Sequence, residues 1–173
     1  DDMKNKFVVG FSLLFLAAYN LIANQSPVII SEFMASNSRI LTDDDGDYSD
    51  WIELFNQSET NVNLAGWYLT DDEAILTKWC FPDVVLGPGE YLLVFASGKN
   101  RTSDIKHLHT NFQLDGSGEF LALVMPDGTT IADGFIPSYP PQTEDVSYGT
   151  PQIKVTSQLL NNTIPLILVP HSQ

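Results

Sequence analysis

Short apolar runs separated by turn residues recur from Val28 onward, and this spacing restricts the fold more than any other feature. The runs are rich in β-branched and aromatic residues, and turns such as Leu-Gly-Pro-Gly and Pro-Asp-Gly stand between them. Runs of this composition, separated by such turns, are typical of antiparallel strands joined as hairpins. The expected strands are 28–34, 50–56, 63–71, 77–82, 90–97, 111–114, 119–125 and 129–135.

A strand roughly every 8–12 residues is typical of a β-sandwich or barrel. No window between Val28 and Tyr148 carries the apolar repeat of a helix. Apolar residues make up 43% of the 173-residue chain, which is enough for the core of one domain. The sequence therefore predicts an all-β domain over residues 27–149.

The N-terminal segment has the layout of a secretory signal peptide. Asp1 and Asp2 are interpreted as residues added ahead of Met3, which is followed by two lysines, an apolar run from Phe7 to Ala23 and a short polar stretch. This order favours a signal-peptide helix in residues 1–26, cleaved near Ala23, with a retained membrane anchor as the alternative. We expect a secreted or cell-surface protein with no membrane span once the signal is removed.

Residues 150–173 follow a proline-rich stretch and contain one or two further strand-like runs. This composition is typical of a linker or of the start of a following domain. The sequence thus predicts three parts: the leader at 1–26, the domain at 27–149 and this C-terminal segment.

The chain is strongly acidic, with 22 aspartates and glutamates against 8 lysines and arginines and a net charge of −14. Such a charge repels phosphate backbones and anionic lipid surfaces. Nucleic-acid binding is therefore disfavoured, and so is membrane docking by charge alone.

Five aspartates crowd the segment between the first two expected strands, within the sequence TDDDGDYSD at 42–50. The EF-hand pattern fails there, because tyrosine stands where that loop needs glycine and leucine where it needs the bidentate glutamate. An oxygen-rich loop still suits a hard cation, so one hypothesis is a Ca²⁺ site. Its ligands would be Asp43, Asp45, Asp47 and Asp50. The other is a solvated polar loop.

Other candidates for chemistry are weaker. His107 and His109 would project to one side of an extended segment, but a zinc site needs more ligands than this pair. The segment Ser-Gly-Lys-Asn at 97–100 lacks the spacing of a phosphate-binding loop, and no Gly-x-Ser-x-Gly motif occurs. Cys80 lies between aromatic residues and is expected to be buried. We expect the domain not to be an enzyme.

An ordered series of motifs resembles a bacterial lamin-tail domain. The series is DWIELFN at 50–56, NLAGWYLTD at 63–71, PGEYLLVF at 88–95 and GEFLALVM at 118–125. The resemblance covers about residues 27–149, and it is specific in combination although each piece alone is weak. It implies an immunoglobulin-like antiparallel β-sandwich.

The resemblance also implies a function. Bacterial domains of this type are accessory modules of secreted or surface proteins, often beside a hydrolase, a kinase-like domain or an adhesive region. In nuclear lamins the related domain docks proteins and DNA, but the acidic charge of this chain departs from that pattern. The leading hypothesis is a non-catalytic interaction module that binds a protein or glycan through a sheet edge or loops and presents neighbouring domains. The alternatives are a Ca²⁺-dependent adhesion or stability module and an accessory domain of a larger exported hydrolase or kinase-like enzyme. The oligomeric state stays open.

Overall fold

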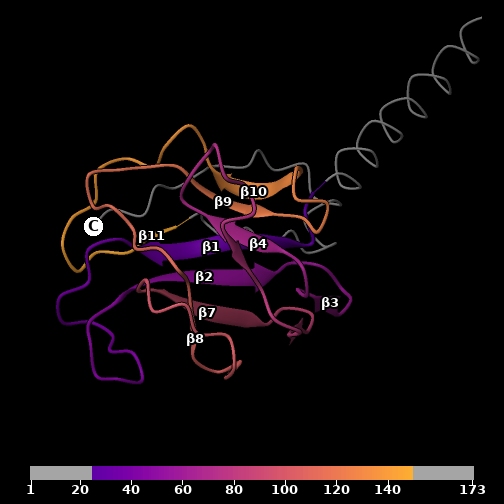
Figure 1. Ribbon diagram of the computed structural model, residues 1–173, viewed down its shortest axis with the longest axis horizontal. Coiled ribbons are helices and arrows are strands. Elements are labelled where there is room, and N and C mark those ends of the chain that lie inside the picture. The colour runs from indigo at the N-terminus through magenta and orange to yellow at the C-terminus, as the bar shows by residue number, and fades with distance from the viewer. Residues whose placement is uncertain (1–24, 150–173) are drawn as a thin grey trace, which may run out of the picture.

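The computed structural model describes residues 25–149, and its regular elements in that range are all β-strands (Figure 1). The expected signal-peptide helix and the C-terminal segment 150–173 lie outside the described residues. No helix that could cross a membrane occurs between residues 25 and 149. The strands are β1 (Val28–Met34), β2 (Asp50–Asn56), β3 (Val62–Asn63), β4 (Tyr68–Thr70), β5 (Trp79–Cys80), β6 (Val85–Leu86), β7 (Tyr91–Ala96), β8 (Leu108–His109), β9 (Leu121–Val124), β10 (Ile131–Phe135) and β11 (Tyr148–Gly149).

Two larger sheets form a β-sandwich. One has five strands in the order β11-β1-β2-β7-β8, and the other has four in the order β10-β9-β4-β5 (Figure 1). Strands β3 and β6 pair separately. The all-β prediction is confirmed, and the layered architecture agrees with the immunoglobulin-like sandwich expected from the sequence.

The core lies between the two large sheets. Alternate residues of the central strands point inward, so Ile52 and Leu54 of β2 and Val94 of β7 have no exposed surface. Leu69 of β4 and Leu121 of β9 meet them from the other sheet in the same apolar cluster. Burying such side chains is the main favourable term in folding a domain of this size.

Each large sheet also has apolar residues on its outer face. Met34, Trp51 and Phe95 form one small cluster, separate from the main core. All three tryptophans are at most 8% exposed, and Trp67 and Trp79 belong to the main core. Aromatic side chains supply large areas of this kind of packing.

The paired strands differ from expectation in three places. Residues 111–114 form no strand, and instead β8 at 108–109 pairs with β7 in parallel rather than as a hairpin. The run 63–71 is interrupted at Gly66, whose φ of +78° ends the extended backbone between β3 and β4. The short strands β6 and β11 had no counterpart in the sequence prediction.

The prediction that Cys80 is buried is wrong. The cysteine is exposed, although its neighbour Trp79 is only 2% exposed. Strand β5 lies at the edge of the four-stranded sheet, and successive side chains of a strand point to opposite faces. Trp79 takes the inward position, so Cys80 faces out.

The antiparallel pairing of β1, β2 and β7 brings both ends of the β1–β2 loop and the segment after β7 to one end of the five-stranded sheet. Met34, the last residue of β1, pairs with Trp51, and Asp50 pairs with Ala96, the last residue of β7. The segments after β1, before β2 and after β7 therefore meet. An isolated bridge between Ser97 and Gln113 adds the segment after β8. We call this the loop end of the sheet.

Candidate binding site at the loop end

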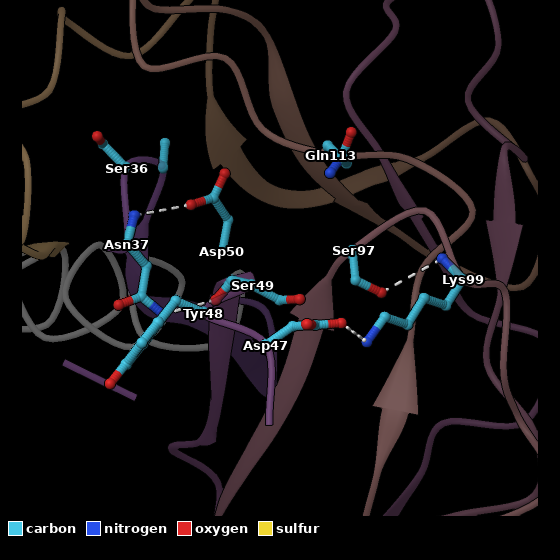
Figure 2. Close-up of a pocket in the computed structure, with 10 residues that line it drawn as sticks. Ser36, Asn37, Asp47, Tyr48, Ser49, Asp50, Ser97, Lys99 and Gln113 are labelled. Atoms are coloured by element: carbon cyan, nitrogen blue, oxygen red, sulfur yellow. Dashed lines mark hydrogen bonds and ion pairs between the residues drawn. The ribbon is translucent and has the colours of Figure 1, made fainter. Parts of the chain in front are cut away.

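A polar cavity of about 590 Å³ opens at the loop end (Figure 2). Most of its lining side chains can donate or accept hydrogen bonds. The lining consists of Ala35, Ser36, Asn37, Asp47, Tyr48, Ser49, Asp50, Ser97, Lys99 and Gln113. Its volume lies within the range of ligand pockets, and its polar lining would suit a polar or charged ligand.

Asp43 organises the aspartate-rich loop beside the cavity. Its Oδ1 accepts hydrogen bonds of 3.0 Å from the amides of Asp45 and Asp47, and its Oδ2 accepts one of 2.8 Å from the Ser49 hydroxyl. Burial opposes its ionisation, but these bonds and one from Lys99 outweigh burial and lower the pKa of Asp43 to about 2. The loop is therefore folded around an ionised carboxylate.

Lys99 reaches into this loop from the segment after β7. Its Nζ donates to Asp43 at 2.6 Å, to Asp45 at 2.7 Å and to Asp47 at 2.9 Å. Burial works against its charge, but the three carboxylates prevail and raise the pKa of Lys99 above its usual value. Arg101 adds a second contact of 2.7 Å to Asp45 and, together with Lys99, lowers the pKa of that carboxyl. The aspartate charges are thus partly offset from within the chain.

The structure brings together three of the four aspartates proposed as Ca²⁺ ligands. Carboxylate oxygens of Asp43, Asp45 and Asp47 lie within 4.8 Å of one another. Lys99 Nζ contacts all three, so the set as arranged does not fit a metal ion unless the ammonium leaves. Asp50 is not part of this group, because its carboxylate faces Asn37. Calcium binding stays a prediction.

Asp50 starts β2 and is a half-buried acid in the cavity lining. Its Oδ1 accepts a hydrogen bond of 3.0 Å from the Asn37 amide, and its Oδ2 accepts none from the described residues. Burial raises the pKa of Asp50 to about 6, against a small opposing effect of that single bond. The carboxylate is therefore costly to keep ionised in the free protein.

Asp50→Asn is expected to raise the free energy of unfolding by about 1–2 kcal/mol at pH 7.5. The amide carbonyl can still accept from Asn37, while the buried charge is gone. This is less than the full pKa shift implies, because the carboxyl borders an open cavity. Urea denaturation of both proteins at a series of pH values measures the difference.

The difference in unfolding free energy between the wild type and Asp50→Asn should depend on pH. The pKa of Asp50 is about 6 in the folded chain, against the ordinary aspartate value of 3.8, so the folded state binds more protons between these values. The wild type should lose stability relative to the variant as the pH rises from about 4 to about 6. A gain that is equally large at pH 4 and pH 7.5 would contradict this account of Asp50.

His109 was not recognised as a partner of the aspartate-rich loop from the sequence. Its ring has no exposed surface and stacks on Phe95. Nε2 lies 2.7 Å from Asp44 Oδ1, and Nδ1 lies 2.8 Å from Ser97 Oγ. The imidazole therefore ties the aspartate loop to the end of β7. No spacing motif signals this, because the three polar residues come from separate segments.

His107 does not join His109 in a pair. It is exposed and bonds Asp104 at 3.1 Å, within its own turn. The two histidines of the hypothetical zinc pair thus contact different acids.

A family model described as Lamin Tail Domain matches residues 22–135. The matched range includes strands β1 to β10 and every residue that lines the cavity. Comparison with curated proteins gave no match.

Proposed function

The chain belongs to the lamin tail domain family, and we propose that it is a non-catalytic, secreted or cell-surface interaction module. It would bind a protein or glycan partner and present neighbouring domains. The observation that carries the proposal is the polar cavity, which is lined by loops from three strand ends on a rigid sheet. Loops held in this way on a sandwich are common places for recognition.

A Ca²⁺-dependent adhesion or stability module is the second candidate. The observation in its favour is the convergence of three carboxylates in the aspartate-rich loop. Lys99 already occupies the centre of that group, so calcium would compete with an ammonium. A role as accessory domain of a larger exported hydrolase or kinase-like enzyme is compatible with the first proposal, because the module would then present that enzyme.

The non-catalytic part of the proposal is tested at Ser97. Its hydroxyl, His109 and Asp44 form a hydrogen-bonded chain beside the cavity, which is the order of groups in serine hydrolases. The imidazole here is fully buried against Phe95, which favours a structural role. Incubation of the chain with a chromogenic ester should give no turnover. Turnover that Ser97→Ala abolishes would contradict the proposal.

The binding part is tested with the whole chain on a sensor surface. Peptides of either charge and an array of neutral glycans would be passed over it. We expect one class to bind saturably and to be weakened by substitutions in the cavity lining. Binding that survives every lining substitution would place the interaction surface elsewhere.

Export is tested by producing the full chain in a host that secretes proteins. If the leader is cleaved near Ala23, mass spectrometry of the medium should find a product that begins close to Asn24. An intact chain retained in the membrane fraction would favour the anchor instead.

A further inference from the structure

We infer that the loop-end cavity binds a basic side chain of a partner polypeptide, a lysine ammonium or an arginine guanidinium, with Asp50 as its counter-ion. This inference rests on the proposed interaction function and names the chemistry of the partner. It is carried by the position of Asp50 in the cavity lining and by the charges around it.

Asp50 is left without a cation by the pairing of its neighbours. Lys99 and Arg101, the two cations beside the aspartate-rich loop, both contact aspartates of the loop 43–47. Arg39, in the loop between β1 and β2, pairs with Asp145 instead. None of these three cations forms an ion pair with Asp50. Among the described residues, the carboxylate has one backbone amide as its only hydrogen-bond donor. An ammonium or guanidinium entering the cavity would supply the missing charge.

The walls of the cavity are already fixed in place. The Asn37 side chain donates to Leu41 O and Ser49 O, and it accepts from the amides of Ile40 and Leu41. These bonds hold the segment after β1 against the segment before β2. A site that is ordered before binding loses little conformational entropy when the ligand arrives.

Two further lining residues can contact a basic group. In Figure 2 Asn37 and Tyr48 lie on one side of Asp50, and Ser97, Lys99 and Gln113 lie on the other. The side-chain amide of Gln113 and the hydroxyl of Tyr48 form no hydrogen bond with the described residues. The oxygen atom of each is therefore free to accept one from a ligand N–H. Tyr48 is also 49% exposed, and an exposed aromatic ring can hold a cation over its face.

Charge distinguishes a basic ligand from the alternatives. A phosphate or an acidic peptide would meet a site with more aspartates than cations. A neutral glycan could use the hydrogen-bonding groups, but it would leave the Asp50 charge uncompensated. The net charge of −14 adds a long-range attraction for basic partners.

The unfavourable effect of Asp50 on the stability of the free protein also supports a basic ligand. A half-buried carboxylate with one hydrogen bond and no cation destabilises the fold at neutral pH. Residues that lower stability in this way are often found where binding repays the cost. Asp47, Lys99 and Tyr48 are the other charged or titratable groups of the lining, and Lys99 contacts Asp47 but not Asp50.

The test uses a fluorescein-labelled octapeptide of alternating lysine and glycine, with the glutamate version as its counterpart. Anisotropy titrations with the 173-residue chain should show saturable binding of the lysine peptide that weakens as salt is added. Asp50→Asn should weaken binding on the order of tenfold, although this variant is expected to be more stable. Glu59→Gln removes the same charge at an exposed site beyond the far end of β2, and it should change affinity less than about twofold.

The outcomes separate this inference from the proposed function. Equal affinity of the wild type and Asp50→Asn for the lysine peptide overturns the inference, and so does absence of binding. Binding of a neutral glycan that Asp50→Asn weakens would also overturn it, while the interaction function would stand. Binding that no substitution in the cavity weakens would overturn the inference and place the interaction surface elsewhere, and absence of binding by every peptide and glycan would overturn both.

Discussion

Replacing Lys99 with methionine is expected to lower the free energy of unfolding by about 2–3 kcal/mol at pH 7. Methionine keeps the apolar stem but removes the ammonium that contacts three carboxylates. The Asp43 side chain has no exposed surface, so its charge would remain buried without its cation. The other two carboxylates, those of Asp45 and Asp47, are more exposed, so water moderates the loss there. Urea denaturation measures the change.

Lys106→Met is the matched control, because this lysine is exposed and forms no ion pair within residues 25–149. Its effect should stay within about 0.5 kcal/mol. The loss in Lys99→Met should also shrink as the pH falls below 4, because the pKa of Asp43 is about 2 in the folded chain against the ordinary aspartate value of 3.8. A Lys99 variant as stable as the control would show that the aspartates form only a solvated loop.

The same variant separates the lysine from calcium as the balancing cation. If Lys99 fills the site, millimolar Ca²⁺ should leave the melting temperature of the wild type unchanged, whereas it should recover part of the loss in Lys99→Met. Stabilisation of the wild type by several degrees, reversed by EDTA, would instead favour the Ca²⁺-dependent module.

Phe33→Ala is expected to have the largest effect on stability, a loss of about 4 kcal/mol. The Phe33 ring is fully buried, and its centroid lies 5.0 Å from that of Phe135, 4.6 Å from Tyr139 and 5.7 Å from Tyr148. It therefore joins β1 to β10 and β11, and alanine would leave a cavity among these aromatic rings. Equilibrium denaturation in urea measures the loss.

Ile105→Ala is a suitable comparison for Phe33→Ala. Ile105 is 49% exposed in the loop after β7, and its truncation should cost less than about 1 kcal/mol. If both variants lost equally little free energy of unfolding, the packing of β1 against the other sheet would not be a main source of the domain's stability.

The strands that sequence predicted best are those with long buried runs. Strands β1 and β2 have the expected bounds, 28–34 and 50–56, because both lie inside the five-stranded sheet and most of their apolar residues are buried. The two-residue strands β6 and β8 could not be foreseen, since so short a run carries no periodic pattern. Their pairing depends on tertiary contacts, and the parallel pairing of β7 with β8 is the clearest case.

The candidate site was predictable only where its residues are neighbours in sequence. Asp43, Asp45 and Asp47 alternate in the sequence and their carboxylates lie close together, while calcium binding there stays a prediction. Their partner Lys99 comes from a segment more than fifty residues away, and no local pattern announces it. Asp50 was grouped with the acids nearest to it, but as the first residue of β2 it faces the cavity instead.

The most direct test of the account is a titration of the lysine peptide into the ¹⁵N-labelled chain, followed by NMR. The account predicts saturable shifts of the backbone amides of Asn37, Asp50 and Gln113, with small changes at the far end of β2 around Glu59. It also predicts that these shifts are lost in Asp50→Asn. Shifts confined to an edge strand such as β5 or β10, or no saturable shift at all, would contradict the assignment of the loop-end cavity as the binding site.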